Sequence, residues 1–464
     1  MTATPLARLA RQPAAAPALA WPGGGMSCGE LSAQLDALAL AASGLGAPDT
    51  PLLVHCASRL NLVLGVLVAL RLGRPALPLD PGRPDLPEIL AACAPGGTIT
   101  DELVASTAGA AGAMAPDMPA ATHDAVTPDA RSGGPAILVP TSGTSGAARV
   151  AMLTGASLDA HVTASAAVLP TLGPGDRWLV CLPMTSIGGL AALWRALSAG
   201  ACLGLVERFD ADQARDFMAE GASHVSAVPA MLSPLAESSA PSPRGLRCLL
   251  SGGGPLSGAA ADAVLARGWP LWTGWGMTET GSHVAAGPVD CDWREGVVGR
   301  PLPGARIRID AATGRLAVGG GMVMSGYAAP GLEPGLGLAP DGSHLSSDLG
   351  EFLPDGRLRV TGRADDVIVS GGVNVHPEPV EAVLSACPGA GDVAVTARAD
   401  ERWGLKLVAL FTGEITPATL DAWARERLPS ASRPREFLRV ERLPRNAMGK
   451  LLRRELRAML PPPR

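Results

Sequence analysis

The stretch AILVPTSGTSGAAR, residues 136–149, joins an apolar run to a loop of small and hydroxylated residues. The apolar part predicts a buried strand, and the loop that follows contains mostly Gly, Ser and Thr. Small residues let backbone N–H groups approach a phosphate chain, hydroxyl groups add donors, and Arg149 adds a forked positive charge. The GxxxxGK[ST] spacing of a Walker A loop is absent, so this is a phosphate-binding loop of another kind. The alternative is an ordinary flexible loop.

Segments of strand and helix length alternate on both sides of this loop. Ser27 to Leu45 is expected to form an amphipathic helix, which begins with a capping box made by Ser27 and Glu30. The run NLVLGVLVALRLG predicts a second helix. Strands are predicted for PLLVHC (51–56), RPALPLDP (74–81), RWLVCLP (177–183), ACLGLVE (201–207), HVSAVP (224–229) and LRCLLSGGG (246–254). This alternation indicates an α/β architecture.

The pattern of apolar residues and glycines changes towards the C-terminus. From about Gly296 the chain shows short β segments separated by Gly, and a compact α+β segment follows. We therefore predict a large N-terminal domain over residues 1–362, with αβ layers and a β-rich subdomain. A small, mobile α+β domain is predicted over residues 363–464. Residues 1–25 are expected to be a loose leader, and residues 107–134 a surface loop.

Composition restricts the class of protein. The chain has 464 residues, of which 47% are hydrophobic, and a net charge of −5, which argues against a disordered chain and against a nucleic-acid partner. The longest apolar run, Leu60 to Leu72, is interrupted by Arg71 and is too short to cross a bilayer, and no secretory signal is visible. The eight Cys lack metal-ligand spacing and predict buried free thiols. We expect a cytoplasmic protein without a membrane partner.

Only two of the 38 basic residues are Lys, namely Lys406 and Lys450. Such an excess of Arg is typical of a GC-rich genome. A retained Lys is then a candidate for a role that a planar guanidinium cannot fill, because an ammonium group is compact. Lys406 is interpreted as a surface residue.

The loop resembles that of the adenylate-forming superfamily, which includes acyl-CoA and aryl-CoA synthetases, nonribosomal-peptide adenylation domains and luciferases. The resemblance extends from about Ser27 to Arg457. The family loop usually reads TSGTTGxPKG, and here Ala148, Arg149 and Val150 stand in place of Pro, Lys and Gly. The resemblance implies that the ATP phosphates are bound by Thr141, Ser142, Gly143, Thr144, Ser145, Gly146 and Arg149.

Two further motifs, SGGGPLS (251–257) and GWGMTETG (274–281), resemble the family's GGAPL turn and YGxTE strip beside adenine. Trp275 would replace the usual Tyr as the stacking face, Thr278 would donate to the α-phosphate, and Glu279 would hold Mg²⁺, a cation that prefers carboxylate and phosphate oxygens. Taken alone, a Glu after Thr is more often a helix cap. The ATP-binding residues implied here are Gly252, Gly253, Gly254, Pro255, Trp275, Gly276, Met277 and Thr278.

The longest match is SSDLGEFLPDGRLRVTGRADDVIVSGGVNVHPEPVE, residues 346–381, which resembles the family's TGD…GRxDD…SGGxNxxPxxVE series. The resemblance implies that Asp348 accepts both ribose hydroxyls, that Arg363 contacts ribose or phosphate, and that Asp365 is the hinge of the small domain. Val373 departs from the common Glu, and two Ser residues replace Thr and Gly before Asp348. The alternative is a plain β-hairpin and Gly turn. The implied CoA-binding residues are Ser370, Gly371 and Gly372.

LPRNAMGKLLRREL (443–456) resembles the family's LPRTxxGKxxR segment, in which Lys450 would bridge the substrate carboxylate and the α-phosphate. By composition alone it could equally be a surface Lys after a Gly turn. LPMTSIGGLAALWRAL (182–197) resembles LPxxHxxGL, whose His gates the acyl pocket, and here that position holds a Ser. His224 is interpreted as a packed residue and the pocket as uncharged. The implied acyl-pocket residues are Ser186, Gly188, Val228, Gly254 and Met277.

The resemblance implies an ATP-dependent carboxylate–CoA ligase that works through an acyl-adenylate on a small aryl or acyl carboxylate. ATP and Mg²⁺ would be its cofactors and CoA its co-substrate, and Lys450, Thr278 and Glu279 its catalytic residues. The length and the Gly188–Gly189 pair are similar to those of o-succinylbenzoate–CoA ligases. Two alternatives stay open, an adenylation enzyme that loads a carrier protein and a non-catalytic nucleotide-binding relative. The acid and the oligomeric state are not indicated.

Overall fold

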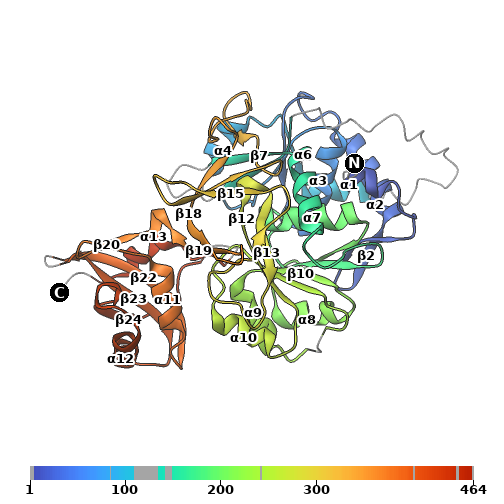
Figure 1. The fold of residues 1–464 in the computed structure, drawn as a ribbon. Coiled ribbons are helices and arrows are strands. Elements are labelled where there is room, and N and C mark those ends of the chain that lie inside the picture. The colour runs from blue at the N-terminus through green and yellow to red at the C-terminus, as the bar shows by residue number, and fades with distance from the viewer. Residues whose placement is uncertain are drawn as a thin grey trace.

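The computed structural model describes residues 5–83, 85–108, 134–141, 149–240, 243–400, 403–445 and 449–461. Figure 1 shows a large body, coloured blue to yellow, and a smaller orange and red body made by the C-terminal part of the chain. This confirms the predicted α/β class with a large N-terminal and a small C-terminal part. None of the described helices is long and apolar enough to cross a membrane.

Two sheets form the framework of the large body. In the first, the described strands lie in the order β14 (Arg300–Pro301), β13 (Ser282–Pro288), β12 (Leu271–Met277), β11 (Cys248–Ser251), β10 (His224–Ala227), β8 (Arg177–Val180), β9 (Cys202–Leu205), β1 (Pro17–Trp21) and β2 (Gly24–Ser27). In the second, the order is β17 (Gly326–Tyr327), β7 (Arg149–Thr154), β6 (Pro135–Thr141), β4 (Ala76–Pro78), β3 (Leu52–His55) and β5 (Gly97–Thr100). Strands β8, β10, β11 and β12 are mutually parallel, as an alternation of strands and helices predicts.

Helices of the large body are α1 (Pro5–Leu9), α2 (Cys28–Ala42), α3 (Arg59–Arg71), α4 (Leu86–Cys93), α5 (Asp101–Ala108), α6 (Gly155–Ala166), α7 (Ile187–Ala199), α8 (Ala211–Ala219), α9 (Pro229–Glu237) and α10 (Gly258–Leu265). The capping box of α2 is confirmed, because the Glu30 amide donates to Ser27 Oγ while Glu30 Oε2 accepts from the Ser27 amide. One hydrophobic core joins both sheets to α3 and α7, so these layers form a single folding unit.

A third sheet and the small body follow. The third sheet contains β15 (Arg306–Ile309), β16 (Arg315–Gly319), β18 (His344–Phe352) and β19 (Leu358–Arg363). The small body contains β20 (Ile368–Ser370), β21 (Val373–Val375), α11 (Pro377–Ser385), β22 (Ala390–Asp400), β23 (Gly404–Gly413), α12 (Pro417–Arg427), β24 (Glu436–Arg439) and α13 (Arg453–Leu456). It has a hydrophobic core of its own, to which Ile368 and Phe411 belong. The boundary after residue 362 stays a prediction.

The expectation of a loose leader over residues 1–25 is wrong for residues 5–25, and residues 1–4 lie outside the described residues. Strand β1 pairs in parallel with β9 and antiparallel with β2, and Leu19 at its centre is buried. The apolar run PALAW is too short to reveal a strand by periodicity, and its partner β9 lies about 180 residues away along the chain. Helix α5 also continues to Ala108, two residues into the predicted surface loop. The rest of that loop, residues 109–133, lies outside the described residues.

Candidate active site

The strip predicted to lie beside adenine is the C-terminal end of β12, where the pairing with β13 is irregular. The register shifts between Trp275 and Gly276, and a Cβ at Gly276 would lie 2.0 Å from the carbonyl oxygen of Ser282. Only glycine can occupy this bulge without moving the backbone of β13. The strand ends in a 3₁₀ turn, Thr278–Thr280, and Gly281 follows with φ +66°. This turn fixes where Thr278 and Glu279 lie.

Asp348 links this strip to the end of β19. The Trp275 indole Nε1 donates to Asp348 Oδ2 at 2.6 Å, and the Arg363 guanidinium pairs with Asp348 Oδ1 at 2.9 Å. Three residues that the resemblance assigns to the ATP site, drawn from two of the motifs, therefore meet. Each carboxylate oxygen has a second lone pair, so the group can still accept two hydroxyls of a ribose. The hydrogen bond from Trp275 is a finding that the sequence did not indicate, and stacking of its ring on adenine stays a prediction.

Lys450, which belongs to the small body, lies near enough to Asp348 for their charges to interact. Protein atoms around its ammonium group lower the pKa of Lys450, Arg363 lowers it further, and Asp348 and Asp366 oppose the shift. The side chain as a whole remains exposed. A Cβ at Gly449 would lie 3.5 Å from the side chains of Val228 and Ala230. The C-terminal tail, residues 449–461, therefore packs against the beginning of α9. The structure thus places the Lys450 ammonium in the electrostatic field of the predicted ribose carboxylate, on a segment that contacts the predicted acyl-pocket wall.

Glu279 is held by the only tyrosine of the chain, which the sequence analysis missed. The Tyr327 hydroxyl donates to Glu279 Oε1 at 2.6 Å, and both residues are buried. Burial and the neighbouring carboxylate raise the pKa of Tyr327, which keeps it a donor. The Arg149 guanidinium lies 4.6 Å from the Tyr327 ring centre. Arg149, a predicted phosphate ligand, and Glu279, the predicted metal ligand, therefore both contact Tyr327. Tyr is even rarer than Lys in this chain, so the reasoning from low abundance that singled out Lys450 applies to Tyr327 as well.

The residues around Glu279 fit Mg²⁺. The hydrogen bond from Tyr327 leaves most acceptor positions of the Glu279 carboxylate available for a cation. The described residues contain no cluster of three or more metal-ligating side chains. A cation held by one carboxylate together with nucleotide phosphates needs none, and this is how Mg²⁺ usually binds in enzymes that act on ATP.

We expect Tyr327→Phe to lower the Mg²⁺ affinity or the adenylation rate about 10- to 100-fold, the usual cost of losing a hydrogen bond to a metal ligand. The ring and its contact with Arg149 remain in this variant, so only the support of Glu279 is removed. Pyrophosphate release measured over a Mg²⁺ titration checks this. An unchanged Mg²⁺ dependence would show that the hydroxyl does not orient the carboxylate.

The acyl-pocket residues are only partly brought together. Ser186 is the N-cap residue of α7 and its hydroxyl donates to the Pro183 carbonyl at 2.7 Å, so it serves the local turn. Gly188 lies against Leu182. Gly254 follows β11. A Cβ at this position would lie 4.0 Å from the Pro229 side chain, next to Val228 in the chain. Whether Ser186 lines the pocket stays a prediction, as do the assignments of Val228, Gly254 and Met277.

Two other predicted sites lie at loops. Thr141 ends β6, whereas Ser142, Gly143, Thr144, Ser145 and Gly146 lie outside the described residues. Gly371 and Gly372 form the turn between β20 and β21 with φ of +57° and +80°, and Ser370 is buried. Asp365 lies in the turn after β19, 3.5 Å from Arg363. Their roles in binding CoA and as a hinge stay predictions.

A buried polar cluster behind the strip was also missed. Arg195 of α7 bonds His161 Nε2 at 2.9 Å and stacks on Trp178 at 4.6 Å, and His161 contacts His283, which pairs with Gly276. Burial lowers the pKa of Arg195 to about 10 and holds both histidines neutral by lowering their pKa values. Among the described residues, Arg195 has no carboxylate within ion-pair distance.

Comparisons with known proteins agree with this geometry. Residues 6–328 match the AMP-binding enzyme family and residues 379–450 match its C-terminal domain. The 2-succinylbenzoate–CoA ligase of Bacillus licheniformis is 35% identical over 69% of this chain and 69% of its own length. The corresponding enzyme of Lactococcus lactis is 31% identical over 69% and 70%.

Solved structures extend the likeness to the whole chain. The o-succinylbenzoate CoA synthetase of Bacillus subtilis in complex with its acyl-adenylate superposes with a TM-score of 0.83 at 27% identity, and covers 98% of both chains. ATP-bound MatB of Rhodopseudomonas palustris gives 0.83 at 25% identity over 99% of both. The chain therefore belongs to the AMP-binding enzymes of the adenylate-forming superfamily, and it is an ATP-dependent, AMP-forming carboxylate–CoA ligase.

Proposed function

We propose that one site catalyses both half-reactions and that Lys450, Thr278 and Glu279 carry out the first. The observation that supports this most is the position of the Lys450 ammonium, which comes from the small body and lies in the field of Asp348 and Arg363. A compact ammonium at this place suits a carboxylate and an α-phosphate that meet there, because a planar guanidinium is broader.

In the first half-reaction, a carboxylate oxygen of the acid attacks the α-phosphorus of ATP, and the bond to the β-phosphate oxygen breaks to release pyrophosphate. Negative charge then crowds at the α-phosphoryl group, where Lys450 and the Thr278 hydroxyl donate hydrogen bonds. Bound Mg²⁺ would neutralise charge on the phosphates from the side of Glu279. Asp348 fixes the ribose, so the α-phosphorus stays in line with the acid.

In the second half-reaction, a thiolate attacks the acyl carbon and AMP leaves. We infer that rotation at Asp365 withdraws Lys450 and brings in the turn that contains Gly371 and Gly372. Support comes from the exposed apolar side chains on both sides of this turn, Val369 and Val373, which are 52% and 43% exposed. Such a surface suits an element that is covered in another pose.

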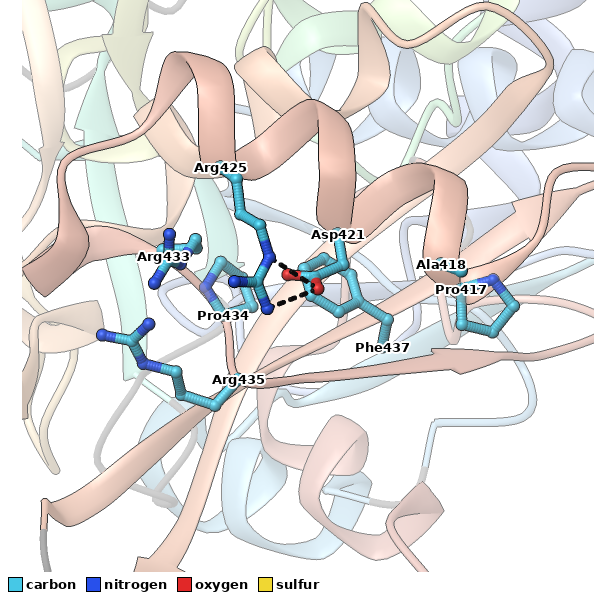
Figure 2. Close-up of a pocket in the computed structure, with 8 residues that line it drawn as sticks. All are labelled: Pro417, Ala418, Asp421, Arg425, Arg433, Pro434, Arg435 and Phe437. Atoms are coloured by element: carbon cyan, nitrogen blue, oxygen red, sulfur yellow. Dashed lines mark hydrogen bonds and ion pairs between the residues drawn. The ribbon is translucent and has the colours of Figure 1, made fainter.

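We propose that the small body binds the nucleotide part of CoA and that a carrier protein does not replace CoA as acceptor. A hollow of about 270 Å³ lies between α12 and β24. Figure 2 shows three arginines and one aspartate among the residues that line it. Arg435 from this hollow also stacks on Trp403 at 4.7 Å, and the Trp403 carbonyl accepts from the Gly371 amide at 2.9 Å. A surplus of positive charge joined to the proposed CoA turn suits the phosphates of CoA, which a carrier-bound arm does not present in the same number.

The acid is proposed to carry a second carboxylate, and 2-succinylbenzoate, the acid named for the relatives, is the first candidate. Arg195 supports this, because it is a buried cation that lacks a described counter-ion and is connected to Gly276 through His161 and His283. The sequence analysis expects an uncharged pocket, and Arg195 argues against that expectation. A second anionic group that approaches from the strip would supply the missing charge.

A panel of acids combined with three acceptors tests the proposal. With ATP·Mg²⁺ and purified enzyme, we expect pyrophosphate release to be fastest with aryl acids that contain two carboxylates, and thioester to form with CoA. Pantetheine, which lacks the nucleotide, should be poorer than CoA by about tenfold, the worth of one charge-assisted hydrogen bond. Faster transfer to a carrier protein would favour the loading enzyme. Absence of pyrophosphate release with every acid would favour a non-catalytic relative.

We further propose that the enzyme works in the cytoplasm. All eight cysteines are free, and seven are buried. Such thiols persist in a reducing compartment, which is also where ATP and CoA are made available.

A further inference from the structure

Arg453 lies three residues after Lys450, at the beginning of α13, and its guanidinium contacts three carboxylates. It forms a forked pair with Glu381 at 2.7 and 2.8 Å, and it lies 3.2 Å from both Glu378 and Asp366. All four side chains are largely buried, with 12–20% of their surface exposed. Glu381 also accepts from the amide of Val395 in β22 at 2.7 Å. Arg453 therefore joins the C-terminal tail, residues 449–461, to α11 and through Glu381 to β22, beside the apolar cluster that Leu456 forms with Ala394 and Leu410.

The same cluster reaches the large body. Asp366 lies 3.8 Å from Arg363, which pairs with the ribose carboxylate Asp348. In addition, a Cβ at Gly362 would lie 3.1 Å from Glu378 Oε2, so α11 packs directly against β19. Ion pairs thus run without a break from Asp348 through Arg363 and Asp366 to Arg453.

Other basic residues of the tail do not share this arrangement. Arg454 is adjacent but exposed, and no ion pair is recorded for it among the described residues. An exposed arginine such as Arg454 contributes little to stability through its charge, because solvent screens its interactions. A buried arginine among three carboxylates differs, since its loss leaves like charges close together.

We propose that Arg453 is a positioning residue for adenylation, which holds the tail on Glu381 and Asp366 so that Lys450 lies at the ribose carboxylate. This rests on the role proposed above for Lys450. Arg453 itself need not touch the substrate. Because the second half-reaction withdraws Lys450, it should depend on Arg453 much less than the first.

The test compares Arg453→Ala with the matched control Arg454→Ala. We expect the kcat of adenylation, followed by pyrophosphate release, to fall about 10²-fold in Arg453→Ala, as a misplacement of about 1 Å can cost. The KM for ATP and the rate of thioester formation from supplied acyl-adenylate should change less than about threefold, and Arg454→Ala should behave as the wild type. Arg453→Lys, which keeps the charge but loses the fork, should recover part of the rate.

Hydrogen exchange gives a readout that does not depend on activity. The Leu452 amide donates to the Pro444 carbonyl, so peptides over residues 449–461 should exchange faster in Arg453→Ala than in Arg454→Ala. Large-domain peptides serve as the reference for folding, and if they also exchange faster, Arg453→Lys decides. Loss of adenylation without faster tail exchange, or equal loss in both half-reactions, overturns the proposal. Faster tail exchange while Lys450→Ala remains active would instead overturn the role of Lys450.

Discussion

Replacing Lys450 by Ala is expected to lower the adenylation rate about 10²- to 10³-fold, the usual cost of removing one preorganised donor to a developing charge. Thioester formation from supplied acyl-adenylate should stay close to the wild-type rate, because Lys450 is withdrawn in that step. Pyrophosphate release and thioester formation, measured separately, check both expectations. Lys450→Arg should not restore adenylation, since a planar fork does not fit between carboxylate and phosphate.

The second lysine of the chain is the matched control. Lys406 on β23 lies 3.5 Å from Asp400 and 3.7 Å from Glu436, within the small body. Lys406→Ala should therefore leave adenylation within about twofold, because its two half-buried ion pairs join strands of the small body and contain no predicted substrate-binding residue. If Lys450→Ala adenylates at the wild-type rate, the mechanism proposed here is wrong.

The same residue predicts a pH dependence. Lys450 acts in its charged form, and desolvation of its ammonium group by nearby protein atoms, together with Arg363, lowers its pKa below that of an ordinary lysine. Adenylation should thus be fully supported below this lowered pKa and be lost as the pH rises through it. The alkaline limb should be missing from the profile of thioester formation from supplied acyl-adenylate.

Glu279→Gln is expected to lower adenylation by a similar factor, about 10²- to 10³-fold. The amide keeps the size of the side chain and can still accept from Tyr327, so the turn should persist while the charge that attracts Mg²⁺ is lost. Pyrophosphate release over a Mg²⁺ titration measures the effect, and excess Mg²⁺ should recover part of the rate.

Glu333→Gln is a suitable control, because Glu333 is exposed and follows Tyr327 by only six residues. It should leave the Mg²⁺ dependence unchanged. A Glu279→Gln enzyme with the Mg²⁺ dependence of the wild type would remove Glu279 from the metal site and leave its hydrogen bond with Tyr327 as a purely structural one.

Particular residues show how far the sequence reaches. The α/β class and the capping box of α2 could be predicted, and the resemblance assigned Trp275, Asp348 and Arg363 to one nucleotide site, but the hydrogen bond between Trp275 and Asp348 could not be predicted. The pairing of β1 with β9 could not, because neither strand contains a signal for the other. Tyr327 and Arg195 were missed for a related reason, since the role of each depends on contact with a residue that is remote in the chain, namely Glu279 and His161.

The sequence by itself determined which chemistry the chain contains, because each motif is a local arrangement of residue types and spacings, such as TSGTSG or the Gly before Lys450. Only the tertiary structure decided which motifs cooperate. Trp275 and Asp348 are 73 residues apart, Tyr327 and Glu279 are 48 apart, and Arg453 and Glu381 are 72 apart. Contacts over such separations depend on sheet order and on how the two bodies pack, and a short stretch of sequence fixes neither.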